Sequence, residues 1–132
     1  EGINVLFDIS NDKSIISHIG NKKYYLSGDS FFQINKFLVS DLYDEVKKNI
    51  KGKKILDLYC GTGSIGIYID SDNVVGIDNN ISNIYDANRN LELNDMNGEY
   101  YLAEVEDIID RFNDFDTVIV DPPRSGLDKI TI

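Results

Sequence analysis

The sequence predicts an α/β fold: a partial doubly wound sheet of four parallel strands, preceded by a short antiparallel β segment and a helix. Three observations predict it. Short apolar runs alternate with helical patterns from residue 54 onward, a glycine-rich segment at residues 61–66 follows the first run, and Asp-Pro-Pro at residues 121–123 follows the last. Because ligands of such sheets bind outside the carboxyl ends of the strands, we expect both motifs at one crevice.

The N-terminal part is expected to be an antiparallel meander. Residues 3–27 contain short apolar runs separated by turn residues, a pattern typical of hairpins. Such a piece is too small to be a domain, so residues 1–29 are interpreted as the remnant of a preceding region. From Ser30 to Gly52 the apolar period becomes helical. The expected apolar face of this helix carries Ile34, Phe37, Leu38, Leu42, Val46 and Ile50.

The remaining elements follow in regular alternation. We expect strands at residues 54–59, 74–77, 100–105 and 117–120, and helical segments at residues 64–69, 81–94 and 108–112. The longest of these helices has apolar positions at Ile81, Ile84, Tyr85, Leu91 and Leu93. Apolar strands that alternate with helices specify parallel βαβ units with helices on both faces. Only eleven residues follow Asp121, so residues 30–132 are expected to be the incomplete N-terminal part of a ligand-binding domain.

Composition narrows the function classes. The chain has 132 residues and a net charge of -10, which argues against this piece alone holding a phosphate backbone, since nucleic-acid affinity comes mostly from cations. Its single cysteine, Cys60, excludes an internal disulfide and a cysteine-based metal site. No apolar run approaches the length of a membrane span and no signal peptide is present, so we expect a cytoplasmic protein without a metal.

The glycine-rich segment indicates nucleotide binding. Residues 61–66 (Gly-Thr-Gly-Ser-Ile-Gly) match the fingerprint in which glycines allow a tight turn and a close approach of backbone to cofactor. Asp78 lies seventeen residues after Gly61, directly after the second expected strand, where a carboxylate can accept both ribose hydroxyls. The alternative role for Asp78 is the N-cap of the helix that starts near Ile81.

Two classes of cofactor fit this loop: a dinucleotide with hydride chemistry, or S-adenosylmethionine with methyl transfer. Asp57 and Tyr59 flank the loop, and Asp121 adds a second acid at the neighbouring strand end. An acidic pocket repels a pyrophosphate and favours a cationic cofactor. The residues therefore favour S-adenosylmethionine, with a dinucleotide oxidoreductase and a nucleotide-sensing binding module as alternatives.

Three ordered motifs resemble one enzyme family. Residues 31–35 (Phe-Phe-Gln-Ile-Asn), 56–63 (Leu-Asp-Leu-Tyr-Cys-Gly-Thr-Gly) and 121–127 (Asp-Pro-Pro-Arg-Ser-Gly-Leu) are similar to motifs of the S-adenosylmethionine-dependent RNA uracil-C5 methyltransferases. That family makes 5-methyluridine in 23S ribosomal RNA or transfer RNA. The resemblance implies a Rossmann-like class I methyltransferase sheet of seven strands, of which four are expected here. We prefer 23S ribosomal RNA as substrate because the loop sequence looks closer to that branch.

The resemblance also implies roles for individual residues. Gln33 would contact the methionine end of the cofactor, Tyr59 and Gly61 would line the same pocket, Asp78 would bind the ribose, and Asp121 would face the cofactor and the target base. Three of these residues also have a structural alternative: Gln33 fits a capping box with Ser30, Tyr59 fits a core position, and Asp121 fits a cap after the strand. Glu104, near the end of the third strand, is where such folds often address the adenine.

No catalytic residue is expected in this chain. The family attacks uracil C6 with a cysteine thiolate, and the resemblance places that nucleophile and the proton-abstracting base beyond the Asp-Pro-Pro-Arg motif. Cys60 is therefore interpreted as a packing residue of the loop, and His18 as a structural residue of the meander. We expect the chain to be inactive alone, with RNA bound mainly through regions absent from it and the base flipped out of its stack.

Overall fold

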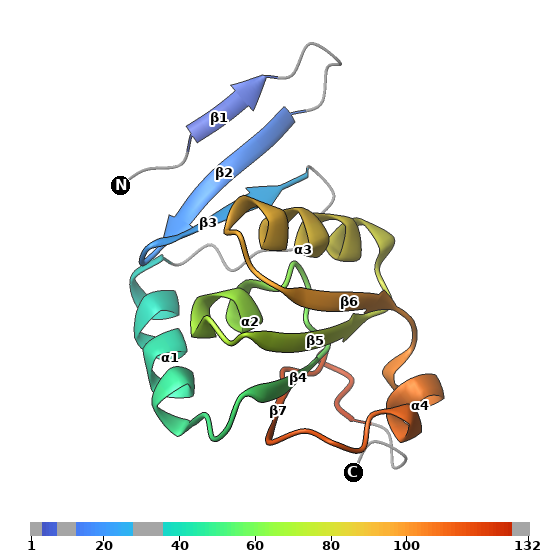
Figure 1. Ribbon diagram of the computed structural model, residues 1–132. Coiled ribbons are helices and arrows are strands. Elements are labelled where there is room, and N and C mark those ends of the chain that lie inside the picture. Colours follow the sequence, from blue (N-terminus) through green and yellow to red (C-terminus); the bar gives the residue numbers. More distant parts are fainter. Residues whose placement is uncertain (1–3, 8–12, 28–35, 128–132) are drawn as a thin grey trace.

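A computed structural model describes residues 4–7, 13–27 and 36–127, which form two sheets (Figure 1). The smaller sheet is antiparallel, in the order β1-β2-β3, and consists of β1 (Asn4–Phe7), β2 (Lys13–Ile19) and β3 (Lys22–Leu26). The larger sheet is parallel and has the order β6-β5-β4-β7. The predicted α/β class, with four parallel strands after an antiparallel segment and a helix, is confirmed.

The parallel sheet is wound from its centre outward. Its strands are β4 (Lys54–Leu58), β5 (Asn73–Asp78), β6 (Gly98–Leu102) and β7 (Thr117–Val120). The chain moves from β4 to β5 and β6 on one side and then crosses to place β7 on the other side of β4. The carboxyl ends of β4 and β7 therefore form a topological switch point, where doubly wound sheets bind their ligands.

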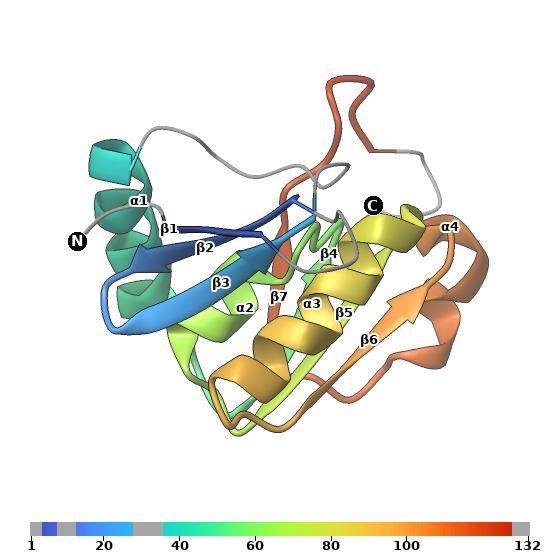
Figure 2. The same cartoon turned by 90° about the horizontal axis from the view of Figure 1, so that it is seen from above.

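Helices cover both faces of this sheet. They are α1 (Lys36–Asn49), α2 (Ser64–Ile69), α3 (Ile81–Leu93) and α4 (Val105–Ile108), and a 3₁₀ turn (Ile109–Arg111) follows the last. One buried cluster joins α1, α2, α3 and the small sheet to one face, and a second joins Val105 to the opposite face through Leu56, Leu58 and Ile77. Figure 2 shows that β3 lies alongside α3. The small sheet therefore packs on the side of this helix that faces away from the parallel sheet (Figure 1).

Two predicted boundaries shift along the chain. The strand expected at residues 100–105 spans Gly98–Leu102, and the helical turn expected at residues 108–112 begins earlier, at Val105. Val105 is 1% exposed and anchors α4 against the sheet, so the chain leaves the strand before it. The acidic residues Glu106 and Asp107 then occupy the first turn of the helix, which its dipole favours.

The predicted apolar face of α1 is wrong in part. Leu38 and Leu42 are 66% and 54% exposed, whereas Val39 and Tyr43 are buried. The buried face is rotated by one residue because Tyr43 packs edge-on against Tyr68 of α2, with ring centroids 5.4 Å apart. Val46 and Ile50 are partly buried as expected. Ile34 and the side chain of Phe37 lie outside the described part of the chain.

The predicted apolar face of α3 is also wrong in part. Ile84 and Leu91 are buried, but Ile81, Tyr85 and Leu93 are exposed. The buried face is instead shared with polar residues, namely Asn83, Asp86 and Asn90. Their hydrogen bonds to neighbouring backbone and side chains explain why a polar stripe faces inward.

Candidate cofactor-binding site

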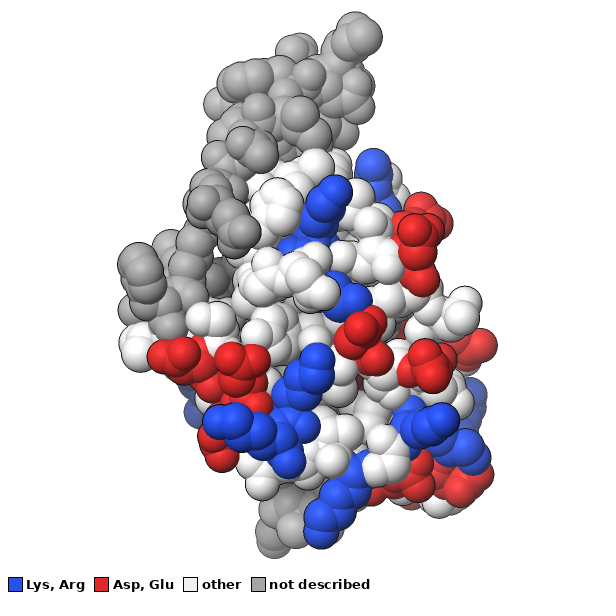
Figure 3. Space-filling model, turned by 60° about the vertical axis from the view of Figure 1, so that its left-hand side comes forward, with Lys and Arg blue, Asp and Glu red and all other residues white. Residues whose placement is uncertain are grey.

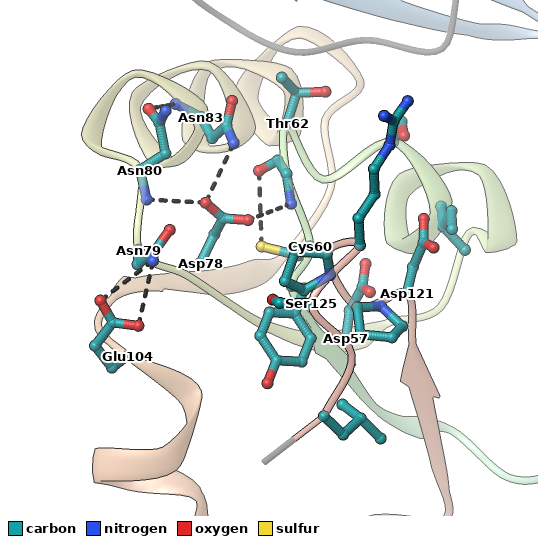
Figure 4. A pocket seen from close by; sticks show the side chains of 18 of the residues that line it. Asp57, Cys60, Thr62, Asp78, Asn79, Asn80, Asn83, Glu104, Asp121 and Ser125 are labelled. Atoms are coloured by element: carbon teal, nitrogen blue, oxygen red, sulfur yellow. Dashed lines mark hydrogen bonds between the residues drawn. The ribbon is translucent and has the colours of Figure 1, made fainter. Parts of the chain in front are cut away.

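A cavity of about 900 Å³ opens at the carboxyl ends of the parallel strands (Figure 4). The glycine loop after β4, the end of β5, the start of α4 and the segment after β7 line it. Four predicted site residues, Tyr59, Gly61, Asp78 and Asp121, lie together in this lining. Gln33, and with it the proposed capping box to Ser30, lies outside the described residues.

The glycine loop has a backbone that only glycines adopt without strain. Gly61 and Gly63 have φ values of 55° and 75°, in the left-handed region. A Cβ at Gly63 would lie 2.6 Å from the ring of the buried Tyr100, whose hydroxyl donates to the Gly63 carbonyl at 3.2 Å. A Cβ at Gly61 would meet nothing within 4 Å, so the space beside this residue is open to a ligand.

Asp78 links the end of β5 to the glycine loop. Its Oδ2 accepts from the backbone N–H of Gly61 at 3.0 Å, and its Oδ1 accepts from the Asn80 N–H at 2.9 Å and from Asn83 Nδ2 at 3.2 Å. Because a carboxylate has about four acceptor sites, these three bonds leave capacity for a ligand hydroxyl. The N-cap of α3 is Asn80, which accepts from the backbone of Ser82 and Asn83, so the capping alternative for Asp78 is wrong.

Asp57 is a residue of the site to which the sequence analysis assigned no individual role. It lies within β4, is 1% exposed, and its Oδ2 has no hydrogen-bond partner among the described residues. Burial, with smaller contributions from Asp121 and Asp78, raises the pKa of its carboxyl to about 7, although a backbone bond from Gly66 opposes the shift. An acid inside an otherwise apolar strand is the sequence signal that identifies such a residue.

Tyr59 both lines the cavity and packs beside the second buried cluster. Its φ of 59° is uncommon for an aromatic residue and marks a strained turn at the end of β4. The hydroxyl donates to Glu106 Oε1 at 2.7 Å, which holds the ring across the gap between β4 and α4. Tyr59 can therefore be a wall of the pocket and a packing residue of the core at the same time.

The rim of the cavity is acidic. Glu104 accepts from Asn79 Nδ2 through both carboxylate oxygens, each at 3.2 Å, at the end of β6. The carboxylates in the described lining are Asp57, Asp78, Glu104, Glu106 and Asp121, against one cationic side chain, Arg124. Such an arrangement attracts a cationic ligand.

Asp121 stands where β7 ends beside β4. Its backbone N–H donates to the Leu58 carbonyl at 3.4 Å, and a turn closed by a 2.8 Å bond from the Gly126 N–H to the Pro123 carbonyl follows. Pro122 and Pro123, which follow Asp121, lack N–H donors, so the hydrogen-bond ladder between β7 and β4 ends at this point. The side chain of Asp121 is exposed toward the cavity, across from Asp57 (Figure 4).

Cys60 is a buried, protonated thiol. Its side chain is 7% exposed, and burial raises its pKa well above the usual value. The sulfur sits so close to β5 that a Cβ at Gly76 would lie 3.0 Å from it. These features fit a packing role. His18 is a half-buried residue of β2 opposite Lys23 and does not line the cavity.

The described residues contain no group of three or more His, Cys, Asp or Glu side chains that could hold a metal ion. None of the described helices is long and apolar enough to cross a membrane.

The chain is similar to known methyltransferases. The model of the methyltransferase small domain family matches residues 27–131. The tRNA (uracil(54)-C(5))-methyltransferase of Pyrococcus furiosus is 38% identical over 115 residues, which are 86% of this chain and 28% of that protein. An RNA methyltransferase of Bacillus cereus without an assigned role is 36% identical over 125 residues, 87% of this chain and 27% of that protein.

A solved structure agrees with these matches. The tRNA (uracil-54, C5)-methyltransferase of Pyrococcus abyssi, in complex with S-adenosyl-L-homocysteine, superposes with a TM-score of 0.79 at 38% identity. The superposition covers 89% of this chain and 30% of that one. The chain thus spans less than a third of the length of each of these three relatives.

Proposed function

Because this chain belongs to the methyltransferase small domain family, we propose that it is the cofactor-binding part of an RNA uracil-C5 methyltransferase. S-adenosylmethionine is the cofactor of this domain. The observation that carries the proposal is the acidic cavity at the switch point between β4 and β7. The cofactor has a cationic ammonium and a cationic sulfonium, so a lining with five carboxylates and one guanidinium suits it.

The residues present fit the cofactor part by part. Asp78 accepts from the Gly61 and Asn80 N–H groups and would accept from the ribose hydroxyls with its remaining capacity. Asp57 offers a buried oxygen, unpartnered within the described chain, that would balance the charge of the ammonium group. The open space at Gly61 allows the cofactor to approach the backbone closely. When bound, S-adenosylmethionine supplies an electrophilic methyl group.

Other predicted contacts belong to the same proposal. Tyr59 would form a wall of the cofactor pocket, Glu104 would lie on the adenine side, and Asp121 would face both the cofactor and the target base. Gln33 keeps its proposed place at the methionine end. No catalytic residue is assigned within this chain, because its only cysteine is buried and protonated.

The substrate proposed is a uridine in structured RNA. The relatives from Pyrococcus furiosus and Pyrococcus abyssi are named for action on uracil 54 of transfer RNA, so transfer RNA takes first place and 23S ribosomal RNA, preferred from the loop sequence, takes second. Basic and acidic side chains are interspersed on the face that Figure 3 turns to the viewer, and they do not form one basic surface. The net charge of -10 for the whole chain supports RNA binding mainly through other parts of a longer protein.

Membership of a methyltransferase family leaves the dinucleotide oxidoreductase without support, and a calorimetric titration tests the choice directly. S-adenosylhomocysteine, the demethylated product, is titrated into the protein beside NAD. We expect saturable binding of S-adenosylhomocysteine and none of NAD. Binding of NAD alone, or of neither compound to a folded protein, would overturn the proposed cofactor.

The RNA assignment needs a separate assay. A longer polypeptide that contains this chain is incubated with methyl-labelled cofactor and unmodified transcripts of transfer RNA or 23S ribosomal RNA. We expect label in 5-methyluridine of the transfer RNA. Label only in the ribosomal transcript would reverse the order of the two substrates, and label on a nitrogen atom would contradict uracil-C5 chemistry.

A further inference from the structure

A polar stripe, formed by Asp86 and Asn90 of α3 and by Asn94 at its C-cap, lies against the edge of the small sheet that β3 forms. The backbone N–H groups of Lys23, Tyr25 and Ser27 donate, in order, to Asn94 Oδ1 at 2.9 Å, Asn90 Oδ1 at 2.5 Å and Asp86 Oδ2 at 2.7 Å. The stripe residues are four apart on the helix and the donors two apart on the strand. These spacings are about 6 Å and about 6.6 Å, so helix and strand stay in register over three bonds.

Asn90 differs from the other two stripe residues because it also contacts the glycine loop. Its Nδ2 donates to the Thr62 carbonyl at 3.1 Å, while its Oδ1 accepts from Tyr25 of β3. Asn90 is 0% and Thr62 2% exposed, so water cannot replace the bond between these two residues. One buried amide therefore joins the edge of the small sheet to the peptide between Thr62 and Gly63.

That peptide belongs to the part of the loop that the cofactor would approach. The neighbouring backbone groups are fixed as well: Asp78 accepts from the Gly61 N–H and the Tyr100 hydroxyl donates to the Gly63 carbonyl. Asn90 completes this set by fixing the carbonyl between them. If the Asn90 bond is lost, the Thr62 carbonyl is left buried without a partner or the peptide rotates, and rotation displaces the loop on its cofactor side.

We propose that Asn90 is a positioning residue that couples the docking of the small sheet on α3 to the geometry of the cofactor loop. The coupling rests on the proposed function only in taking this loop as the cofactor site. Because such coupling is reciprocal, binding of the cofactor also tightens the small sheet on the helix. A molecule that binds the small sheet would therefore change the geometry of the cofactor loop.

Two matched variants separate positioning from packing. Asn90→Asp keeps the acceptor for Tyr25 but replaces the donor to Thr62 with an oxygen, whereas Asn94→Asp makes the same change in the same stripe without a loop contact. At a temperature where both are folded, we expect Asn90→Asp to weaken S-adenosylhomocysteine binding by about tenfold and Asn94→Asp by less than about twofold. We expect the ¹⁵N resonance of Gly63 to shift in Asn90→Asp and not in Asn94→Asp. Equal affinities in the two variants, with unfolding free energies lowered alike, would show a purely structural role.

Hydrogen exchange in the unmodified protein tests the coupling without a variant. We expect S-adenosylhomocysteine to slow exchange of the Tyr25 amide, which Asn90 accepts, more than exchange of the Lys23 amide, which Asn94 accepts. Bound ligand with no change at Tyr25 would overturn the proposal. If the ligand does not bind at all, the proposed function fails, and the Gly63 resonance in the two variants still decides whether Asn90 holds the loop.

Discussion

The Asp78 carboxylate and the backbone N–H of Gly61 are joined by a 3.0 Å hydrogen bond, seventeen residues apart in the chain. The bond ties the end of β5 to the loop that follows β4, two adjacent strands of the sheet. Asp78 therefore has two tasks in the proposed site, since it holds the loop and offers its remaining acceptor capacity to the ribose.

The first prediction concerns Asp78→Ala. Loss of hydrogen bonds to a charged group should weaken S-adenosylhomocysteine binding by about 1.5 to 3 kcal/mol, or roughly 10- to 150-fold. Calorimetry on the folded variant measures it. Asp107→Ala removes an exposed carboxylate of α4 that does not line the cavity, and it should bind as the unmodified protein does. Unchanged affinity in Asp78→Ala would remove the ribose assignment.

The second prediction compares two loop glycines. Alanine at Gly63 meets the buried Tyr100 ring at 2.6 Å and adopts a left-handed φ, so Gly63→Ala should lower the unfolding free energy by about 2 to 5 kcal/mol. Gly61→Ala has the backbone cost alone and should lose about 1 to 2 kcal/mol. Urea unfolding of both variants gives the values. Equal losses would mean that Tyr100 does not restrict the loop.

The elements of the sheet and the glycine loop were predictable because their signals are local. Apolar runs, turn glycines and the Asp-Pro-Pro motif depend on neighbours in sequence, and these correctly located β4, β5 and β7. The faces of α1 and α3 were not predictable in the same way. Leu38 points outward because Val39 and Tyr43 occupy the buried face of α1, where Tyr43 packs against Tyr68. Asn90 points inward because it accepts a hydrogen bond from the Tyr25 N–H at the edge of β3.

The site shows the same division. Position after a strand placed Asp78 and Asp121 at the cavity, since the carboxyl ends of parallel strands share one edge. The support of the loop by Asn90 and Tyr100 comes from other elements, at separations of 28 and 37 residues, and no local pattern announces it. The sequence also does not show that one oxygen of the Asp57 carboxyl has no hydrogen-bond partner among the residues that the structure describes.

The third prediction concerns pH. Asp57 titrates near pH 7 in the folded chain, and its ionised form attracts the ammonium group of the ligand. Affinity for S-adenosylhomocysteine should therefore rise as pH increases from about 6 to 8. Calorimetry across this range should show the rise in the unmodified protein and a flatter profile in Asp57→Asn. The same slope in both would exclude Asp57 as its source.

The raised pKa of Asp57 also determines how the unfolding free energy changes with pH. This dependence is an independent check of the pKa. A carboxyl whose pKa is raised from 3.8 to about 7 binds its proton more tightly in the folded state than in the unfolded state. Its contribution is complete below about pH 4 and is lost as pH rises toward 7. The unfolding free energy of the unmodified protein, relative to Asp57→Asn, should fall across this window.

The fourth prediction is that Cys60 is inert in the folded protein. Burial and a raised pKa keep the thiol protonated, so its reaction with a thiol reagent at neutral pH should be slow until the chain is unfolded. Cys60→Ser should retain S-adenosylhomocysteine binding, with a stability loss on the order of 1 kcal/mol. Rapid labelling of the native protein would contradict the packing role.

The last prediction is that the 132-residue chain binds S-adenosylhomocysteine but methylates no RNA. Attack on uracil C6 requires a thiolate, and the single cysteine of this sequence is 7% exposed, with a pKa that burial raises well above its usual value. The assay mixes the chain with methyl-labelled cofactor and an unmodified transfer RNA or 23S transcript, beside a blank without protein. A longer polypeptide that contains the chain is the positive control. Label in 5-methyluridine from the chain alone would show that Cys60 or another group within it performs the attack, and the assignment of Cys60 to packing would fall with it.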